Sequence, residues 1–230
     1  MNLAIIPARG GSKRIPGKNI KNFAGKPIIS YSIDAAQKSG MFDEVMVSTD
    51  NDKIATVARA CGASVPFVRS DNNSDDYATI ADVVAEVIRE YQKHKKEYEW
   101  ICVIYPTAPF VTADKLRAAF NSVLNENADG VLPVTQYSYP PQRGLVIEES
   151  HLKMKWPENL TLRSQDLEPI FHDSGQFCFV KTEAFLREKT LFLKKTIPFI
   201  VSELEVQDVD SETDWTLAEL KYQLMLNGDC

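Results

Sequence analysis

The sequence lacks the patterns that mark membrane, exported and metal-rich proteins. No apolar run approaches the roughly 18 residues that a membrane-spanning helix needs, so we expect no contact with a membrane. The N-terminus has no charged region followed by a signal-like apolar stretch, so we expect a cytoplasmic protein. The histidines show no paired metal spacing. Four cysteines form no C-x-x-C pair and are predicted to be reduced thiols; they are Cys61, Cys102, Cys178 and Cys230.

Motifs for covalent catalysis and for binding ATP in a P-loop are also missing. The chain has no G-x-S-x-G sequence and no Cys–His signature, so a covalent intermediate is not predicted. Gly11 and Gly17 are one residue too far apart for a Walker A loop, and no G-x-G-x-x-G occurs. A P-loop kinase is therefore disfavoured.

A broad positive surface is not expected either. The formal net charge is −6. Residues 1–26 carry six Lys and Arg and no acid, which leaves 20 basic against 32 acidic residues in the rest of the chain. An acidic body argues against a nucleic-acid partner, whereas a concentrated cationic segment favours a small anion.

The most informative stretch is the glycine-rich segment 5–19, which follows a short apolar run that is typical of a buried strand. Gly10 and Gly11 let the backbone turn sharply and approach a ligand, and successive amide N–H groups in such a turn form an anion-binding nest. This pattern favours a polyphosphate site, and a solvated basic loop is the alternative. Four cations surround the turn: Arg9, Lys13, Arg14 and Lys18.

Strand-like and helix-like segments alternate along the chain, which predicts one α/β domain over 1–230 with a three-layer, Rossmann-like arrangement and a mainly parallel sheet. The expected strands are 2–7, 45–48, 65–68, 100–105, 131–135, 176–181 and 197–202. The expected helices are 27–38, 50–61, 78–95, 112–123, 183–188 and 211–224. Asp50 is expected to cap the second helix, with a ribose contact as the alternative.

Residues 136–172 interrupt this alternation with aromatic residues and prolines and little helical period. We expect an antiparallel excursion from the domain. Its exposed aromatic residues could form a subunit contact, or they could pack as a surface flap on a monomer.

Ligands of open parallel sheets bind where strands end, so loop 8–19, loop 69–77 and segment 105–109 are expected on one edge. Asp208 and Asp210 are two residues apart in an extended segment, so their side chains should point to the same side. Such a pair beside a phosphate loop suits a magnesium ion that accompanies a nucleotide. The alternative is a pair of surface acids near a helix N-terminus.

The segment 7–19 resembles the signature of the sialic-acid-type cytidylyltransferases, and so do 105–110, 163–178 and 206–215. The resemblance implies attack of a sugar's anomeric hydroxyl on the α-phosphate of CTP, a homodimer formed through 136–172, and Mg²⁺ held by Asp208 and Asp210. It implies catalytic roles for Arg9, Lys18, Asp208 and Asp210. The nucleotide-binding residues that it implies are Ala8, Gly10, Gly11, Ser12, Lys13, Asn19, Arg69 and Thr79.

The chain departs from the sialic acid members at two places. Tyr105 stands where they carry glutamine, and 172–178 replaces their Asn-Gly-x-Phe-Tyr stretch. Both this stretch and 163–167 look more like the pseudaminic acid branch, so we expect that nine-carbon acidic sugar as substrate. Sialic acid and ketodeoxyoctulosonic acid remain alternatives, as does a non-catalytic module that senses CTP. The expected sugar-binding residues are Tyr105, Arg143, Arg163, Gln176 and Phe177.

Overall fold

The structure is a computed structural model that describes residues 1–228, so the predicted thiol of Cys230 lies outside the described residues. A seven-stranded sheet has the strand order β11-β6-β10-β5-β1-β4, and β9 pairs with β6. Strands β4, β1, β5, β6 and β11 run in one direction, and β10 and β9 run against them. The strands are β1 (Asn2–Pro7), β4 (Glu44–Ser48), β5 (Trp100–Ile104), β6 (Gly130–Gln136), β9 (Phe171–Asp173), β10 (Phe177–Lys181) and β11 (Thr196–Ile200).

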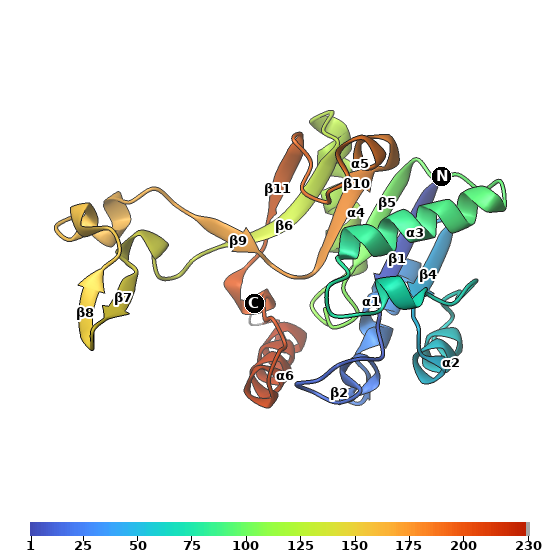
Figure 1. Ribbon diagram of the computed structural model, residues 1–230, viewed down its shortest axis with the longest axis horizontal. Coiled ribbons are helices and arrows are strands. Elements are labelled where there is room, and N and C mark those ends of the chain that lie inside the picture. Colours follow the sequence, from blue (N-terminus) through green and yellow to red (C-terminus); the bar gives the residue numbers. More distant parts are fainter. Residues whose placement is uncertain (229–230) are drawn as a thin grey trace.

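Helices cover both faces of this sheet, which confirms the predicted α/β layering. One hydrophobic cluster packs α1, α2 and α4 on one face, and a second packs α3 and α5 on the other. Figure 1 shows α3 crossing in front of β1 and β5. All five residues of β5 are buried, as expected for a central strand with helices on both sides. These helices are α1 (Ile29–Ser39), α2 (Asp52–Ala60), α3 (Ile80–Lys93), α4 (Ala113–Asn125) and α5 (Thr182–Glu188).

A third hydrophobic cluster joins the two ends of the chain. The last helix, α6 (Glu212–Asn227), places Trp215 edge-on against Phe23, which lies in the small hairpin of β2 (Asn22–Phe23) and β3 (Lys26–Pro27). Ile15 of the glycine-rich loop and Val209 are buried in the same cluster. The residues just before α6 are therefore held beside the glycine-rich loop.

Three local predictions were wrong. The first helix begins at Ile29, because Pro27 belongs to β3. Segment 65–68 is not a strand, since only Ser64 forms an isolated bridge with Met46. Asn51 caps α2 in place of Asp50, and its Oδ1 accepts from the N–H groups of Lys53 and Ile54.

An arm projects from the body between β6 and β9 (Figure 1). Its ends are anchored because β6 and β9 pair antiparallel, and its tip is a hairpin of β7 (Leu145–Glu148) and β8 (His151–Met154). Short 3₁₀ helices fill the rest: η3 (Pro141–Arg143), η4 (Pro157–Asn159) and η5 (Ser164–Asp166). The large apolar side chains exposed on the arm include Tyr139, Leu145, Ile147, Leu152 and Leu160. A subunit contact through this arm stays a prediction.

The remaining 3₁₀ turns are η1 (Lys18–Ile20), η2 (Asp71–Asn73) and η6 (Glu203–Glu205). Within residues 1–228, no helix combines the length and the apolar character needed to cross a bilayer.

Candidate functional site

A cavity of about 490 Å³ lies where the parallel strands β1, β4 and β5 end. The predicted segments meet there, because the glycine-rich loop, the loop that precedes α3 and residues 105–107 all line it. Its polar lining includes Arg9, Ser12, Lys13, Arg14, Lys18, Asn19, Arg69, Asn73, Asp75, Asp76, Thr107 and Asp210.

Lys18 connects the glycine-rich loop to the segment that carries the two predicted carboxylates. Lys18 Nζ donates to the carbonyl of Val209 at 2.7 Å and lies 3.5 Å from Asp210 Oδ1. Arg14 Nη2 lies 2.9 Å from Asp210 Oδ2. Gly17, directly before Lys18, has a φ of 65°, a left-handed conformation that glycine adopts at little cost. Residues 9–19 and 209–210 therefore share one site.

The glycine turn is less open than predicted. The N–H of Gly10 donates to Asp50 Oδ1 at 2.8 Å, the N–H of Ser12 to the Gly10 carbonyl at 3.0 Å, and the N–H of Ala8 to the Ser48 carbonyl at 2.9 Å. Within residues 1–228, the N–H groups of Arg9, Gly11 and Lys13 make no hydrogen bond to protein. The expectation that Gly10 and Ser12 offer free amides is therefore wrong, and Asp50 supports the turn instead of capping a helix.

Two buried polar side chains hold the base of the cavity. Asn19 is buried, and its Nδ2 donates to the Arg9 carbonyl at 2.9 Å. Arg69 is 4% exposed, and its guanidinium donates to the hydroxyl and the carbonyl of Ser48 at the end of β4. Burial lowers the pKa of Arg69 to about 10, so it remains cationic at neutral pH.

A second cavity, of about 370 Å³, adjoins the first, because Tyr105 and Thr107 line both. Asp208 opens into this second cavity and Asp210 into the first, so the two carboxylates flank Tyr105 without sharing one pocket. Burial raises the pKa of the Tyr105 phenol, which keeps it neutral. The other residues around the second cavity are His172, Asp173, Ser174, Gly175, Val206 and Gln207.

The acidic pair fits a metal ion only if other ligands join it. Among residues 1–228, no group of three His, Cys, Asp or Glu side chains gathers as a protein-only metal site. Mg²⁺ is ordinarily held by one or two carboxylates together with phosphate and water oxygens. Asp210 is therefore a suitable donor beside a triphosphate in the first cavity, whereas Asp208 opens into the second.

Several predicted residues lie outside both cavities. Thr79 caps α3 through a reciprocal capping box with Asp82, and Phe177 is fully buried in the core, so direct ligand contacts from these side chains are not supported. Gln176 is 2% exposed, and its Nε2 donates a hydrogen bond to the Glu205 carbonyl at 2.8 Å. Arg143 and Arg163 lie on the arm; Arg143 Nη1 is 3.4 Å from Ser164 Oγ, and Arg163 pairs with Asp166 at 2.7 Å.

The structure also adds residues that the sequence reading passed over. Thr107 lies in the Pro-Thr turn three residues after the end of β5, where its position could have identified it. Asp173 ends β9 and Ser174 follows it; both lie in segment 172–178, which the family resemblance points to without naming them as site residues. Burial raises the pKa of the Asp173 carboxyl.

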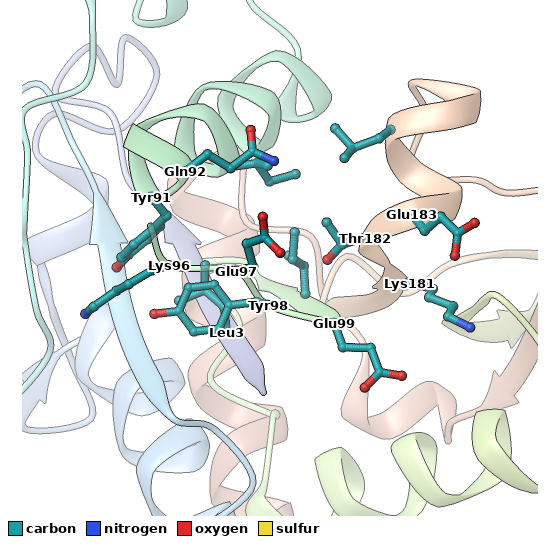
Figure 2. Close-up of a pocket in the computed structure, with 13 residues that line it drawn as sticks. Leu3, Tyr91, Gln92, Lys96, Glu97, Tyr98, Glu99, Lys181, Thr182 and Glu183 are labelled. Carbon is teal, nitrogen blue, oxygen red and sulfur yellow. The ribbon is translucent and has the colours of Figure 1, made fainter. Parts of the chain in front are cut away.

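A separate cavity of about 300 Å³ lies at the opposite end of the sheet, between α3 and α5 (Figure 2). Leu3, Tyr91, Tyr98 and Thr182 are among its lining residues, and it shares none with the two cavities above. It adjoins the amino ends of β1 and β5, whereas ligands of open α/β sheets bind at the carboxyl ends. We therefore assign the site to the first two cavities.

Comparison with known proteins gives a consistent result. A family model described as cytidylyltransferase matches residues 3–218. A pseudaminic acid cytidylyltransferase of Campylobacter jejuni serotype O:2 is 41% identical over 97% of each chain. A CMP-N,N'-diacetyllegionaminic acid synthase of Legionella pneumophila is 31% identical over 96% of each chain. A solved CMP:2-keto-3-deoxy-manno-octonic acid synthetase, complexed with CTP, has a TM-score of 0.67 at 17% identity, covering 98% of this chain and 99% of that one.

The close approach of Gly10 to Asn51 leads to a testable prediction. A Cβ on Gly10 would lie 2.8 Å from Asn51 Nδ2 and 3.0 Å from its Cβ, and Asn51 is held in place by its capping bonds. Gly10→Ala should therefore lower the free energy of unfolding by about 1–3 kcal/mol, as overpacking does. Urea denaturation measures this change.

Gly11→Ala is the matched control, because nothing lies within 4 Å of a Cβ built there. It should leave the unfolding midpoint within experimental error. Equal destabilisation by the two substitutions would contradict the account of the turn.

Proposed function

The chain belongs to the cytidylyltransferase family, and from this premise we propose that it joins CMP from CTP to the anomeric hydroxyl of pseudaminic acid with release of pyrophosphate. The protein is a nucleotidyltransferase. The observation that carries the proposal is the contact of Lys18 with Val209 and Asp210, because it puts fixed cations and a carboxylate around one cavity.

The charges of the first cavity suit the triphosphate. The sugar hydroxyl oxygen forms a bond to the α-phosphorus, the bond from this phosphorus to the bridging oxygen breaks, and negative charge grows on the pyrophosphate. Arg9, Lys13 and Lys18 would neutralise this charge in place, and such preorganised positive charge is usually the largest catalytic contribution. Mg²⁺, held by Asp210 and Asp208, would supply further neutralisation when bound.

Asp208 is placed to act on the attacking hydroxyl. Its carboxylate opens into the second cavity and makes no hydrogen bond to protein within the described residues. We propose that the sugar occupies this second cavity and that Asp208 takes the proton of its hydroxyl, directly or through a water molecule.

The second cavity provides acceptors but no lysine or arginine among its lining residues. The sugar's carboxylate therefore needs a positive charge from elsewhere. Arg143 and Arg163 lie on the arm, which points away from the body (Figure 1). We propose a homodimer in which the arm brings these arginines to the site of the partner subunit, since Arg matches carboxylate geometry. The exposed apolar residues of the arm support this contact.

We place the reaction in the cytoplasm, because the described cysteines Cys61, Cys102 and Cys178 are free thiols, as is usual in a reducing compartment.

An assay of pyrophosphate release from CTP tests the reaction and the sugar together. We expect turnover with pseudaminic acid and Mg²⁺, little turnover with N-acetylneuraminic or ketodeoxyoctulosonic acid, and none after chelation of the metal. Asp210→Asn should lower kcat by at least about 10²-fold, because it removes a charged metal ligand.

Turnover with N-acetylneuraminic acid alone would overturn the choice of sugar. Binding of CTP without turnover on any of these sugars, retained in Asp210→Ala, would favour a CTP-sensing module.

Mixing two inactive variants tests the arm. Arg163→Ala disables the arm of one subunit and Asp210→Asn disables the cavity of the other. Half of the randomly exchanged dimers are mixed and each has one intact composite site, so about a quarter of the wild-type activity should return. Mixed dimers that form but stay inactive would contradict a contribution from the partner's arm.

A further inference from the structure

Two cations of the glycine-rich loop share one carboxylate from the loop that precedes α3. Arg9 Nη1 lies 3.0 Å from Asp76 Oδ1, and Lys13 Nζ contacts Asp76 Oδ2. Arg9 Nη1 also donates to the Asp75 carbonyl at 2.8 Å. Arg9, Lys13 and Asp76 all line the 490 Å³ cavity. One carboxylate thus bridges two cations with separate oxygens, as a phosphate group can.

The backbone that carries Asp76 is held by contacts that do not involve its own side chain. Asp75 Oδ1 accepts from the N–H groups of Tyr77 at 2.9 Å and Ala78 at 2.8 Å, which shapes the turn. Glu86 is 8% exposed and accepts from the N–H of Ser70 at 2.8 Å and from Asn73. Replacing the Asp76 side chain should therefore leave the loop folded.

The two ion pairs of Asp76 are weak enough to be displaced. The side chains of Arg9, Lys13 and Asp76 are 39%, 77% and 46% exposed, and ion pairs at this exposure contribute little to stability. Hydrogen bonds from Lys13 and Arg9 lower the pKa of the Asp76 carboxyl, so it is ionised at neutral pH. A triphosphate brings more negative charge to the same two cations than one carboxylate does.

We propose that Asp76 is an internal competitor of the nucleotide: it occupies Arg9 and Lys13 in the empty site, and a phosphate group of CTP displaces it. This inference rests on the proposed function. Asp76 then sets the nucleotide affinity without touching the bound nucleotide. Asp76 keeps Arg9 and Lys13 oriented toward an anion in the cavity. Breaking these two ion pairs then offsets part of the free energy of CTP binding.

Calorimetric titration of CTP into Asp76→Asn tests this inference. Removing the competing charge should lower the Kd for CTP about three- to tenfold, a range set by two exposed ion pairs. The gain should shrink at high ionic strength, because salt screens exposed charges.

Asp71→Asn is the matched control. Asp71 is an exposed acid of the same loop whose side chain makes no hydrogen bond or ion pair within residues 1–228, so the variant loses the same unit of charge without a contact. Its Kd should stay within about twofold of wild type.

A Kd for Asp76→Asn equal to that of the control would overturn the inference. Weaker binding would overturn it too, because Asp76 would then help to hold the nucleotide or its metal ion. If wild-type protein binds no CTP, the proposed function fails and the inference falls with it. Wild-type binding without a gain in Asp76→Asn removes this inference alone.

Discussion

The site depends on a single amino group, Lys18 Nζ, which donates to the carbonyl of Val209 across 191 residues of sequence. This contact joins the turn after the first strand to the segment before the last helix. Together with the ion pair of Arg14 and Asp210 and the packing of Ile15 with Val209, it fixes the position of Asp210 relative to the glycine-rich loop. The cluster of Phe23 and Trp215 next to it removes apolar surface from water and so adds a driving force for the approach to that of this partly buried hydrogen bond.

The site is built from opposed charges that are only partly balanced. Five cations line the first cavity, namely Arg9, Lys13, Arg14, Lys18 and Arg69, against the carboxylates of Asp75, Asp76 and Asp210. The excess favours an anionic ligand, whereas the adjoining cavity carries carboxylates and no lysine or arginine. In the proposed reaction, this division separates the place of the phosphates from the place of the sugar's hydroxyl and amide groups. It is also the reason that we propose positive charge from a second chain for the sugar acid.

The sequence allowed the layered fold and the meeting of the glycine-rich loop with the Asp210 segment to be predicted, because each part has a local signal. The strand and helix periods of the sequence predict the layers of the fold. The paired glycines with nearby lysines predict the glycine-rich loop, and two acids shortly before a helix cap predict the segment that carries Asp210. Other features have no local signal. The choice of Asn51 over Asp50 as cap depends on Asp50 being taken by Gly10, 40 residues away. The pairing of Asp76 with Arg9 spans 67 residues. Phe177 was expected near the sugar but is fully buried, because β10 pairs with β5 in the centre of the sheet.

A crystal structure with CTP and Mg²⁺ tests the central claim most directly. The account predicts that the triphosphate lies between Lys18 and Asp210, in the cavity where β1, β4 and β5 end, with the metal ion on the aspartates. CTP bound anywhere else, for example in the cavity between α3 and α5 at the opposite end of the sheet, would contradict it.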